Sequence, residues 1–173
     1  CSSKRLSGLY FALPYKEKSL TRKLIYQFKY KPYTKNLAKT LASLIIEHLI
    51  ITQKNTDEIW NNAVLIPVPL FSKKLKERGD NQSEELAKEL SKILRVPVIS
   101  DSLKKIKQTE SQIKLSKEER EKNLRGAFKV IAMSDIAILS GKKVFLVDDV
   151  YTTGSTMEEC ARVLRNAGAK SVW

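Results

Sequence analysis

The sequence predicts an α/β fold in which a mainly parallel, twisted sheet is flanked by helices. Two short apolar runs, at 64–68 and 144–147, have the length and composition of buried strands in a parallel sheet. An amphipathic helical pattern follows each run, and strands that alternate with helices imply βαβ units. The 173 residues suffice for one sizeable core, so we expect a single domain over 1–173.

The other elements follow from the spacing of apolar residues along the chain. Amphipathic helices are expected over 20–28 and 37–49, and a polar connection over 55–62 leads to the first strand. A basic loop over 70–80 precedes a helix whose capping box pairs Asn81 with Glu84. The polar stretch 108–122 has no apolar face and is expected to be mobile, and the last helix is expected over 157–166, ending at Gly168. Four further short runs are strand candidates: 96–99, 103–107, 127–130 and 136–139.

Most of the functional information lies in segment 144–156, Val-Phe-Leu-Val-Asp-Asp-Val-Tyr-Thr-Thr-Gly-Ser-Thr. A hydroxyl-rich loop joins a strand to a helix N-terminus, where free backbone N–H groups and the helix dipole favour a phosphate. Asp148 and Asp149 stand at the carboxyl edge of the strand, where ligands of open α/β sheets bind. Their carboxylates suit sugar hydroxyls or a hydrated Mg²⁺, so the segment indicates a sugar phosphate with a metal. The loop residues are Thr152, Thr153, Gly154, Ser155 and Thr156.

Three other interpretations of this segment agree less well with its residues. A P-loop requires Gly-x-x-x-x-Gly-Lys-Ser/Thr, and no such run occurs. A phosphoacceptor receiver domain carries its paired acids near the start of its fold, whereas only 24 residues follow Asp149 here. An ordinary strand–turn–helix has no need for two acids and four hydroxyl side chains in one loop. The sugar phosphate interpretation is therefore favoured.

A second candidate anion site is the basic loop after the strand at 64–68. Lys76 adds positive charge, Arg78 supplies a bidentate fork, and Gly79 lets the backbone approach a ligand closely. The alternative is a solvated basic surface loop. A third segment is polar and, taken alone, typical of solvated chain; it holds Lys105, Lys107, Thr109, Gln112, Leu115, Ser116, Arg120 and Asn123, followed by Gly126-Ala127-Phe128.

The composition limits the partners and the compartment. A net charge of +13 attracts polyanions such as nucleic acid, although a proteome with Lys as its default surface residue would give the same excess. No apolar run approaches the ~20 residues of a membrane span, and no secretory apolar region follows the first residues, so we expect a cytoplasmic protein without membrane insertion. Cys1 and Cys160 alone make neither a disulfide framework nor a zinc site, and Cys160 is expected in the core.

Four motifs stand in order along the chain. They are Ile-Pro-Val-Pro from Ile66, Arg-Gly-x-Asn-Gln from Arg78, Thr-x-x-Gln-x-x-Leu-Ser-x-x-x-Arg-x-x-Asn from Thr109, and Val-Asp-Asp-Val-x-Thr-Thr-Gly-x-Thr from Val147. Together they resemble the ComF family, phosphoribosyltransferase-like proteins associated with natural transformation, the uptake of single-stranded DNA. The resemblance covers roughly residues 10–173 and implies a type I phosphoribosyltransferase fold with a flexible lid loop.

The resemblance implies roles for the candidate residues. Asp148 and Asp149 would contact the ribose hydroxyls of phosphoribosyl pyrophosphate (PRPP) together with Mg²⁺, and residues 152–156 would cradle its 5-phosphate. The basic loop would hold the pyrophosphate, and the third segment would be the lid that closes over it. The residues implied in these two parts are Lys76, Arg78, Gly79, Lys105 and Lys107.

The expected function is therefore a PRPP- and Mg²⁺-binding protein that handles single-stranded DNA in natural transformation, with other competence proteins as further partners. Two alternatives remain open: an active phosphoribosyltransferase of nucleotide metabolism, with an unidentified acceptor, and a PRPP-sensing regulator. No aromatic-rich hood for an acceptor is evident in the sequence. Candidates for base stacking are Tyr26, Tyr30, Tyr33 and Trp60.

The chain departs from the family pattern at two places. Asp80 stands where the family usually carries an aromatic residue, which bears on the packing of the pyrophosphate loop. Family members usually begin with a four-cysteine zinc module, of which only Cys1 is present in this chain. One thiolate cannot close a tetrahedral zinc site, so Zn²⁺ is expected only if a cysteine module precedes Cys1.

Overall fold

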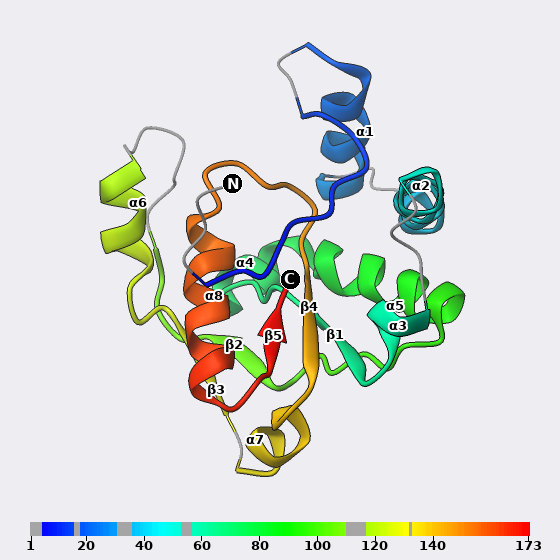
Figure 1. Ribbon diagram of the computed structural model, residues 1–173. Helices are drawn as coiled ribbons and strands as arrows, with labels where there is room; N and C mark the ends of the chain where they lie inside the picture. The colour runs from blue at the N-terminus through cyan, green and yellow to red at the C-terminus, as the bar shows by residue number, and fades with distance from the viewer. Residues whose placement is uncertain (1–4, 16–17, 31–35, 53–56, 110–116, 132) are drawn as a thin grey trace.

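A parallel sheet forms the centre of the computed structural model (Figure 1), which describes residues 5–15, 18–30, 36–52, 57–109, 117–131 and 133–173. The sheet contains β1 (Ala63–Pro67), β4 (Lys143–Val147) and β5 (Ser171–Val172) in the order β1-β4-β5. Its register pairs Ala63 with Lys143 and Pro67 with Val147, so β1 and β4 end at the same level. The two apolar runs of the sequence are thus the two neighbouring strands at the middle of the fold.

Helices cover both faces of this sheet, which is why its strands are apolar throughout rather than alternating. On one face lies α8 (Ser155–Asn166), and on the other lie α5 (Gln82–Leu94), α2 (Leu37–Ile51) and α1 (Leu20–Lys29). Successive strand residues point to opposite faces, so Val144 packs in the core beside α8 and Phe145 in the core beside α5. Cys160 is fully buried on the α8 side, as the sequence predicted.

Shorter elements complete the fold. β2 (Leu103–Lys105) and β3 (Phe128–Val130) form an antiparallel pair, with α6 (Lys117–Leu124) between them in the chain. Helix α3 (Asp57–Trp60) precedes β1, α4 (Ser72–Arg78) follows it, and α7 (Met133–Leu139) precedes β4. Glu159 of α8 accepts a hydrogen bond from the Gly126 N–H (2.8 Å), which fixes the segment after α6 to the helix behind the hydroxyl-rich loop.

The N-terminal segment 5–15 crosses the carboxyl edge of β5 without regular structure. The Ser7 N–H donates to the Val172 carbonyl oxygen (2.7 Å), and the Arg165 side chain donates to the Arg5 carbonyl (2.6 Å) and to the Ser7 hydroxyl (3.0 Å). Gly8 lies against Trp173 so closely that a Cβ on Gly8 would come within 2.5 Å of the indole. The first half of this segment is thereby attached to α8 and β5.

Three expectations about secondary structure were wrong. Run 136–139 is the end of helix α7, because a short apolar run does not distinguish a strand from a helix by its period. Most of the basic loop 70–80 is helix α4, whose Lys, Leu, Glu and Arg residues favour helix. Segment 96–99 forms only one parallel bridge, between Val98 and Leu65, rather than a strand.

The other expected elements lie close to their predicted positions. Of the stretch 108–122, residues 110–116 lie outside the described part of the chain, so its predicted mobility stays a prediction. From Lys117 onward the structure has helix α6, which packs against α8 through the fully buried Leu124. Within the described residues, no helix combines the length and apolar character needed to cross a membrane.

Candidate functional site

The acidic pair, Asp148 and Asp149, follows β4 at the carboxyl edge of the sheet. Because Pro67 pairs with Val147, the chain leaving β1 and the acidic pair leaving β4 emerge next to each other. Asn81 then donates a side-chain hydrogen bond to the Val68 carbonyl (3.1 Å) and caps α5 by accepting from the Ser83 N–H (3.2 Å). The start of α5 is therefore fixed beside the acids. Ligand sites of open α/β sheets occupy this position.

Asp148 lies in surroundings that disfavour its charge. Burial, and next the negative charge of Asp149, raise the pKa of Asp148 to about 7. Three groups oppose this shift: Lys29 by its charge, the Ser83 hydroxyl, which donates to Oδ1 (3.0 Å), and the Asp149 N–H, which also donates to Oδ1 (2.9 Å). A cation or a set of hydroxyl donors at this carboxylate would relieve the unfavourable charge.

Asp149 is already paired with a cation from the distant helix α1. The Lys29 ammonium lies 2.9 Å from Oδ1 of Asp149, and the two side chains are only 20% and 10% exposed. Ser83 and Lys29 are the polar groups at the acidic pair that sequence reasoning missed as site residues. Lys29 is the last residue of α1, and nothing in the sequence indicates a contact across 120 residues.

Three further cations, Lys74, Arg78 and Lys105, form a basic cluster near the acidic pair. Burial, followed by the charges of Arg78 and Lys29, lowers the pKa of Lys74. Burial, followed by the charge of Lys74, lowers the pKa of Lys105. Crowded like charges of this kind favour a bound anion, which would raise the pKa of both ammonium groups.

The remaining basic-site predictions have different outcomes. Arg78 donates to Gln82 Oε1 (3.1 Å), and its guanidinium carbon lies 5.4 Å from the centre of the Tyr30 ring. Gly79 ends helix α4 with a positive φ of 89°, so in the structure it serves as the C-terminal cap of that helix. Lys76 and Lys107 are exposed, and within the described part of the chain neither side chain pairs with the acidic pair.

The hydroxyl loop, residues 152–156, lines a small hollow of about 20 Å³. Asp148 and the residues directly before and after the loop complete this lining. Gly154 is the N-cap of α8 and has a φ of 78°, a conformation that glycine adopts without strain. A Cβ at Gly154 would also collide with the Tyr151 hydroxyl. The Thr153 and Ser155 hydroxyls lie 3.0 Å apart. The first N–H groups of α8 have no partner within the helix, so the loop is suited to an anion.

The donor set fits a magnesium ion that arrives with its ligand. Among the described residues there is no group of three or more His, Cys, Asp or Glu side chains that could hold a metal by itself. Mg²⁺ is usually bound by one or two carboxylates together with waters and substrate phosphates, and the acidic pair supplies two carboxylates. Cys1, the predicted zinc ligand, lies outside the described residues.

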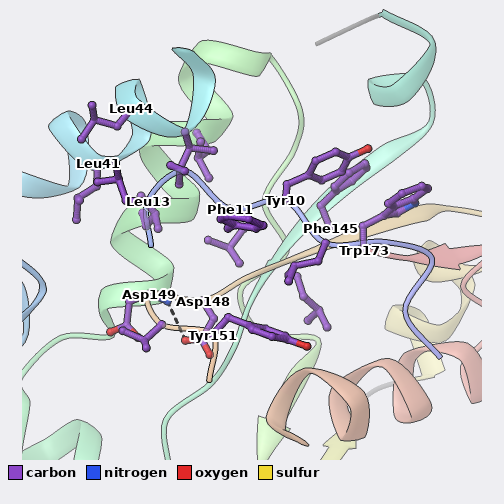
Figure 2. A pocket seen from close by; sticks show the side chains of 18 of the residues that line it. Tyr10, Phe11, Leu13, Leu41, Leu44, Phe145, Asp148, Asp149, Tyr151 and Trp173 are labelled. Carbon is purple, nitrogen blue, oxygen red and sulfur yellow. Dashed lines mark hydrogen bonds between the residues drawn. The ribbon is translucent and has the colours of Figure 1, made fainter. Parts of the chain in front are cut away.

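A second feature adjoins the acidic pair: a cavity of about 440 Å³, here called the apolar cavity. It lies between the N-terminal segment, α2, α5 and β4, and Figure 2 shows the acidic pair and Tyr151 at one end of it and Tyr10, Phe145 and Trp173 at another. This aromatic lining could not be predicted, because its rings come from segments that are far apart in the chain.

The comparisons with known proteins agree with this geometry. A family model described as "Phosphoribosyl transferase domain" matches residues 80–173, which include the acidic pair and the hydroxyl loop. The chain belongs to this family. The type I phosphoribosyltransferase fold expected from the motifs is therefore confirmed.

Curated relatives confirm the resemblance to the ComF family. Competence protein F of Haemophilus influenzae is 35% identical over 135 residues, which are 78% of this chain and 57% of that protein. DNA utilization protein YhgH of Salmonella typhi is 31% identical over 149 residues, 86% of this chain and 63% of that protein. The chain thus spans about three fifths of the length of these relatives.

Among solved structures, glutamine PRPP amidotransferase from B. subtilis, complexed with ADP and GMP, aligns with a TM-score of 0.40 and 22% identity. The alignment covers 64% of this chain and 21% of that chain.

Proposed function

We propose that this ComF-family protein binds PRPP with Mg²⁺ at the carboxyl edge of β4. One observation supports the proposal: the acidic pair adjoins both the hydroxyl loop, which suits a phosphate, and the basic cluster, which suits a pyrophosphate. PRPP carries these two anionic groups on either side of a ribose. The charges around the acidic pair therefore suit this ligand.

In this proposal the acidic pair accepts hydrogen bonds from the ribose hydroxyls, and the first N–H groups of α8 with the loop hydroxyls donate to the 5-phosphate. The ammonium groups of Lys74 and Lys105 and the Arg78 guanidinium hold the pyrophosphate. Bound Mg²⁺ would neutralise charge that develops on a leaving pyrophosphate. Lys29 must give up or share Asp149 when the ribose binds, since both require the same carboxylate.

Calorimetric titration of PRPP with Mg²⁺ tests this proposal. We expect saturable binding to the wild type and a loss of affinity of at least about a hundredfold in the Asp148→Ala/Asp149→Ala double variant, because two charge-assisted contacts disappear. A matched control is Asp57→Ala/Glu58→Ala. This double variant removes two adjacent exposed acids from α3, which precedes the opposite end of β1. Failure of the wild type to bind, or equal weakening in both variants, would refute the proposed site.

We propose further that the protein handles single-stranded DNA, as the names of its relatives as competence and DNA utilization proteins suggest. The net charge of +13 and an exposed pair of aromatic rings support this. Tyr26 and Tyr30, 64% and 47% exposed, lie with ring centres 4.7 Å apart, and Arg78 stands over Tyr30. Stacked bases on aromatic rings beside cations are the usual means of single-strand binding.

Fluorescence anisotropy of a labelled oligo(dT) tests this second proposal by measuring the affinity for single-stranded DNA. We expect affinity to fall steeply with salt, and to fall further in the Tyr26→Ala/Tyr30→Ala double variant, because phosphate contacts release counterions and bases stack on the rings. A flat salt dependence would contradict DNA binding through the basic surface. Tyr33, the third tyrosine suggested for stacking, lies outside the described residues, and Trp60 packs on Phe145 in the core with ring centres 4.6 Å apart.

The same preparations distinguish an enzyme from a regulator. Pyrophosphate release from PRPP would identify transfer to an acceptor or to water. A change in DNA affinity on addition of PRPP, without any release of pyrophosphate, would identify a PRPP-sensing regulator.

A further inference from the structure

Helix α1 presents two aromatic rings to solvent, those of Tyr26 and Tyr30, here called the tyrosine pair. Ile25 and Phe28 attach the helix to the core and are buried, whereas both tyrosines are exposed. Tyr30 is the C-cap of α1, and its N–H donates to the Tyr26 carbonyl oxygen (3.0 Å), which fixes the two residues one turn apart. The pair therefore contributes little to the core and offers planar surface to a ligand.

Arg78 connects the tyrosine pair to the basic cluster. Its guanidinium carbon lies 5.4 Å from the centre of the Tyr30 ring, and its Nη1 donates to Oε1 of Gln82 (3.1 Å), a residue that is only 3% exposed. A guanidinium has five N–H donors, and the contact with Gln82 requires one of them. Arg78 can thus donate to a phosphate while Gln82 and Tyr30 hold it in place.

Two lysines extend this positive charge toward the acidic pair. Lys74 precedes Arg78 by one turn of α4, and Lys29 directly precedes Tyr30. Partial burial, followed by the charges of Arg78 and Lys29, lowers the pKa of Lys74, so these three cations from two helices lie near one another. The Lys29 ammonium also contacts Asp149 at 2.9 Å. A continuous set of interactions therefore leads from the acidic pair through the cations to the tyrosine pair.

Single-stranded DNA has the chemistry to bind across this surface. Bases stack on exposed aromatic rings, and cations beside the rings bind the phosphates that join the nucleotides. A strand stacked on the tyrosine pair therefore brings a phosphate to Arg78, the cation in contact with Tyr30. The pyrophosphate of PRPP requires the same guanidinium in the function proposed above.

We propose that the tyrosine pair and the basic cluster form one binding surface for single-stranded DNA, on which a backbone phosphate of the strand takes the position of the pyrophosphate at Arg78. This inference rests on the proposed function, since it needs both ligands to bind the same protein. Two anionic groups at one guanidinium repel each other, so PRPP and the strand compete. By linkage, each ligand lowers the affinity of the other by the same factor.

Lys29 has an opposite effect, which is the smaller one. A ribose that takes Asp149 releases the Lys29 ammonium, and this adds one positive charge beside the tyrosine pair. The pyrophosphate brings several negative charges to the same surface. Because Coulomb energy scales with charge, its repulsion of a DNA phosphate outweighs the attraction by one ammonium at a similar distance. The expected net result is a loss of DNA affinity.

Competition with inorganic pyrophosphate tests the inference. Labelled oligo(dT) is titrated with the protein in Mg²⁺ buffer, with and without saturating pyrophosphate, and fluorescence anisotropy gives the affinity for DNA. We expect pyrophosphate to lower this affinity at least about tenfold, and oligo(dT) to lower the pyrophosphate affinity measured by calorimetry by the same factor. Ribose 5-phosphate at matched ionic strength is the control, because its phosphate suits the hydroxyl loop rather than the basic cluster. It should change the DNA affinity less than about twofold.

Three variants locate the shared position. Arg78→Gln should weaken the binding of both oligo(dT) and pyrophosphate at least about fivefold, because each ligand loses a charge-assisted contact. Tyr26→Ala should weaken oligo(dT) alone, since it removes a stacking ring and no charge. Arg95→Gln is the matched control: it removes the same charge from an exposed residue at the far end of the 13-residue helix α5, and neither affinity should change more than about twofold.

The outcomes separate the inference from the proposed function. If oligo(dT) and pyrophosphate both bind without affecting each other's affinity, the inference is overturned while both proposed ligands stand. An equal effect of ribose 5-phosphate and pyrophosphate would overturn it too, since the competition would then not arise at the basic cluster. The same holds if Arg78→Gln binds either ligand as tightly as the wild type. Lack of DNA binding, or of PRPP and pyrophosphate binding, would refute that part of the proposed function and with it the shared surface.

Discussion

Replacement of Asp148 by asparagine should stabilise the fold while it weakens ligand binding. The pKa of Asp148 is raised to about 7 from an ordinary value of 3.8, first by burial and then by Asp149. For an acid with a raised pKa the folded state holds its proton longer than the unfolded state. Stability is therefore lost as pH rises from about 4 to 7, and the full cost is present above pH 7. Asparagine removes this cost and still accepts the Ser83 hydrogen bond through its amide oxygen.

The expected size follows from the shift. Three pKa units correspond to about 4 kcal/mol in the free energy of unfolding. Asp148 lines the cavity and retains contact with solvent, which screens its charge, so we expect a gain of about 2 kcal/mol at pH 8. For a chain of this length that gain raises Tm by roughly 4–8 °C. At pH 5 most of the cost is absent from the wild type, and the gain should be less than half as large.

Urea unfolding at pH 5 and pH 8, followed by tryptophan emission, measures the gain in the free energy of unfolding at each pH. Asp149→Asn is the comparison variant: it breaks the ion pair with Lys29 but also removes the charge that raises the pKa of Asp148. It should therefore destabilise the fold and reduce the pH dependence. A destabilised Asp148→Asn protein at pH 8, or the same gain at both pH values, would refute the reasoning.

Three further predictions concern α8 and its loop. Gly154→Ala should lower the free energy of unfolding by about 1–3 kcal/mol, because the positive φ is strained for alanine and its Cβ would meet Tyr151. Thermal unfolding measures this loss, and an unchanged stability would show that the loop shifts to relieve the strain. Glu159→Gln should cost about 1–3 kcal/mol, since the carboxylate accepts two hydrogen bonds from Arg162 and one from the Gly126 N–H. Burial raises the pKa of the Cys160 thiol, so iodoacetamide at pH 8 should modify Cys160 only after unfolding, and mass spectrometry of the modified peptide checks this.

The centre of the fold and the position of the site could be predicted from the sequence. The apolar runs at 64–68 and 144–147 are continuous because both faces of the sheet are covered, and this pattern is typical of parallel strands. The family resemblance placed the acidic pair after the second run and the basic segment after the first around one ligand. The register of Pro67 with Val147 brings the ends of the two runs side by side.

The contacts at the site could not be predicted, since they depend on how distant segments pack. The pair between Lys29 and Asp149 requires α1 to lie over the edge of the sheet, and no local pattern encodes this position. The aromatic lining of the apolar cavity could not be predicted for the same reason: Tyr10 and Trp173 are far apart in the sequence and stack only in the folded state. The helical state of α7 was missed because its short apolar run fits two periodicities.

The order of the strands has a consequence for biosynthesis. The central strand β4 emerges from the ribosome about 80 residues after its partner β1, as the pairing of Ala63 with Lys143 requires. Until then the nascent chain holds β1, α2 and α5 with an apolar sheet edge that lacks its neighbour. Closing so long a loop is slow, and unpaired apolar strands aggregate. The sheet can therefore pair only after β4 has left the ribosome, and chaperones that shield apolar segments of nascent chains should matter most before that point.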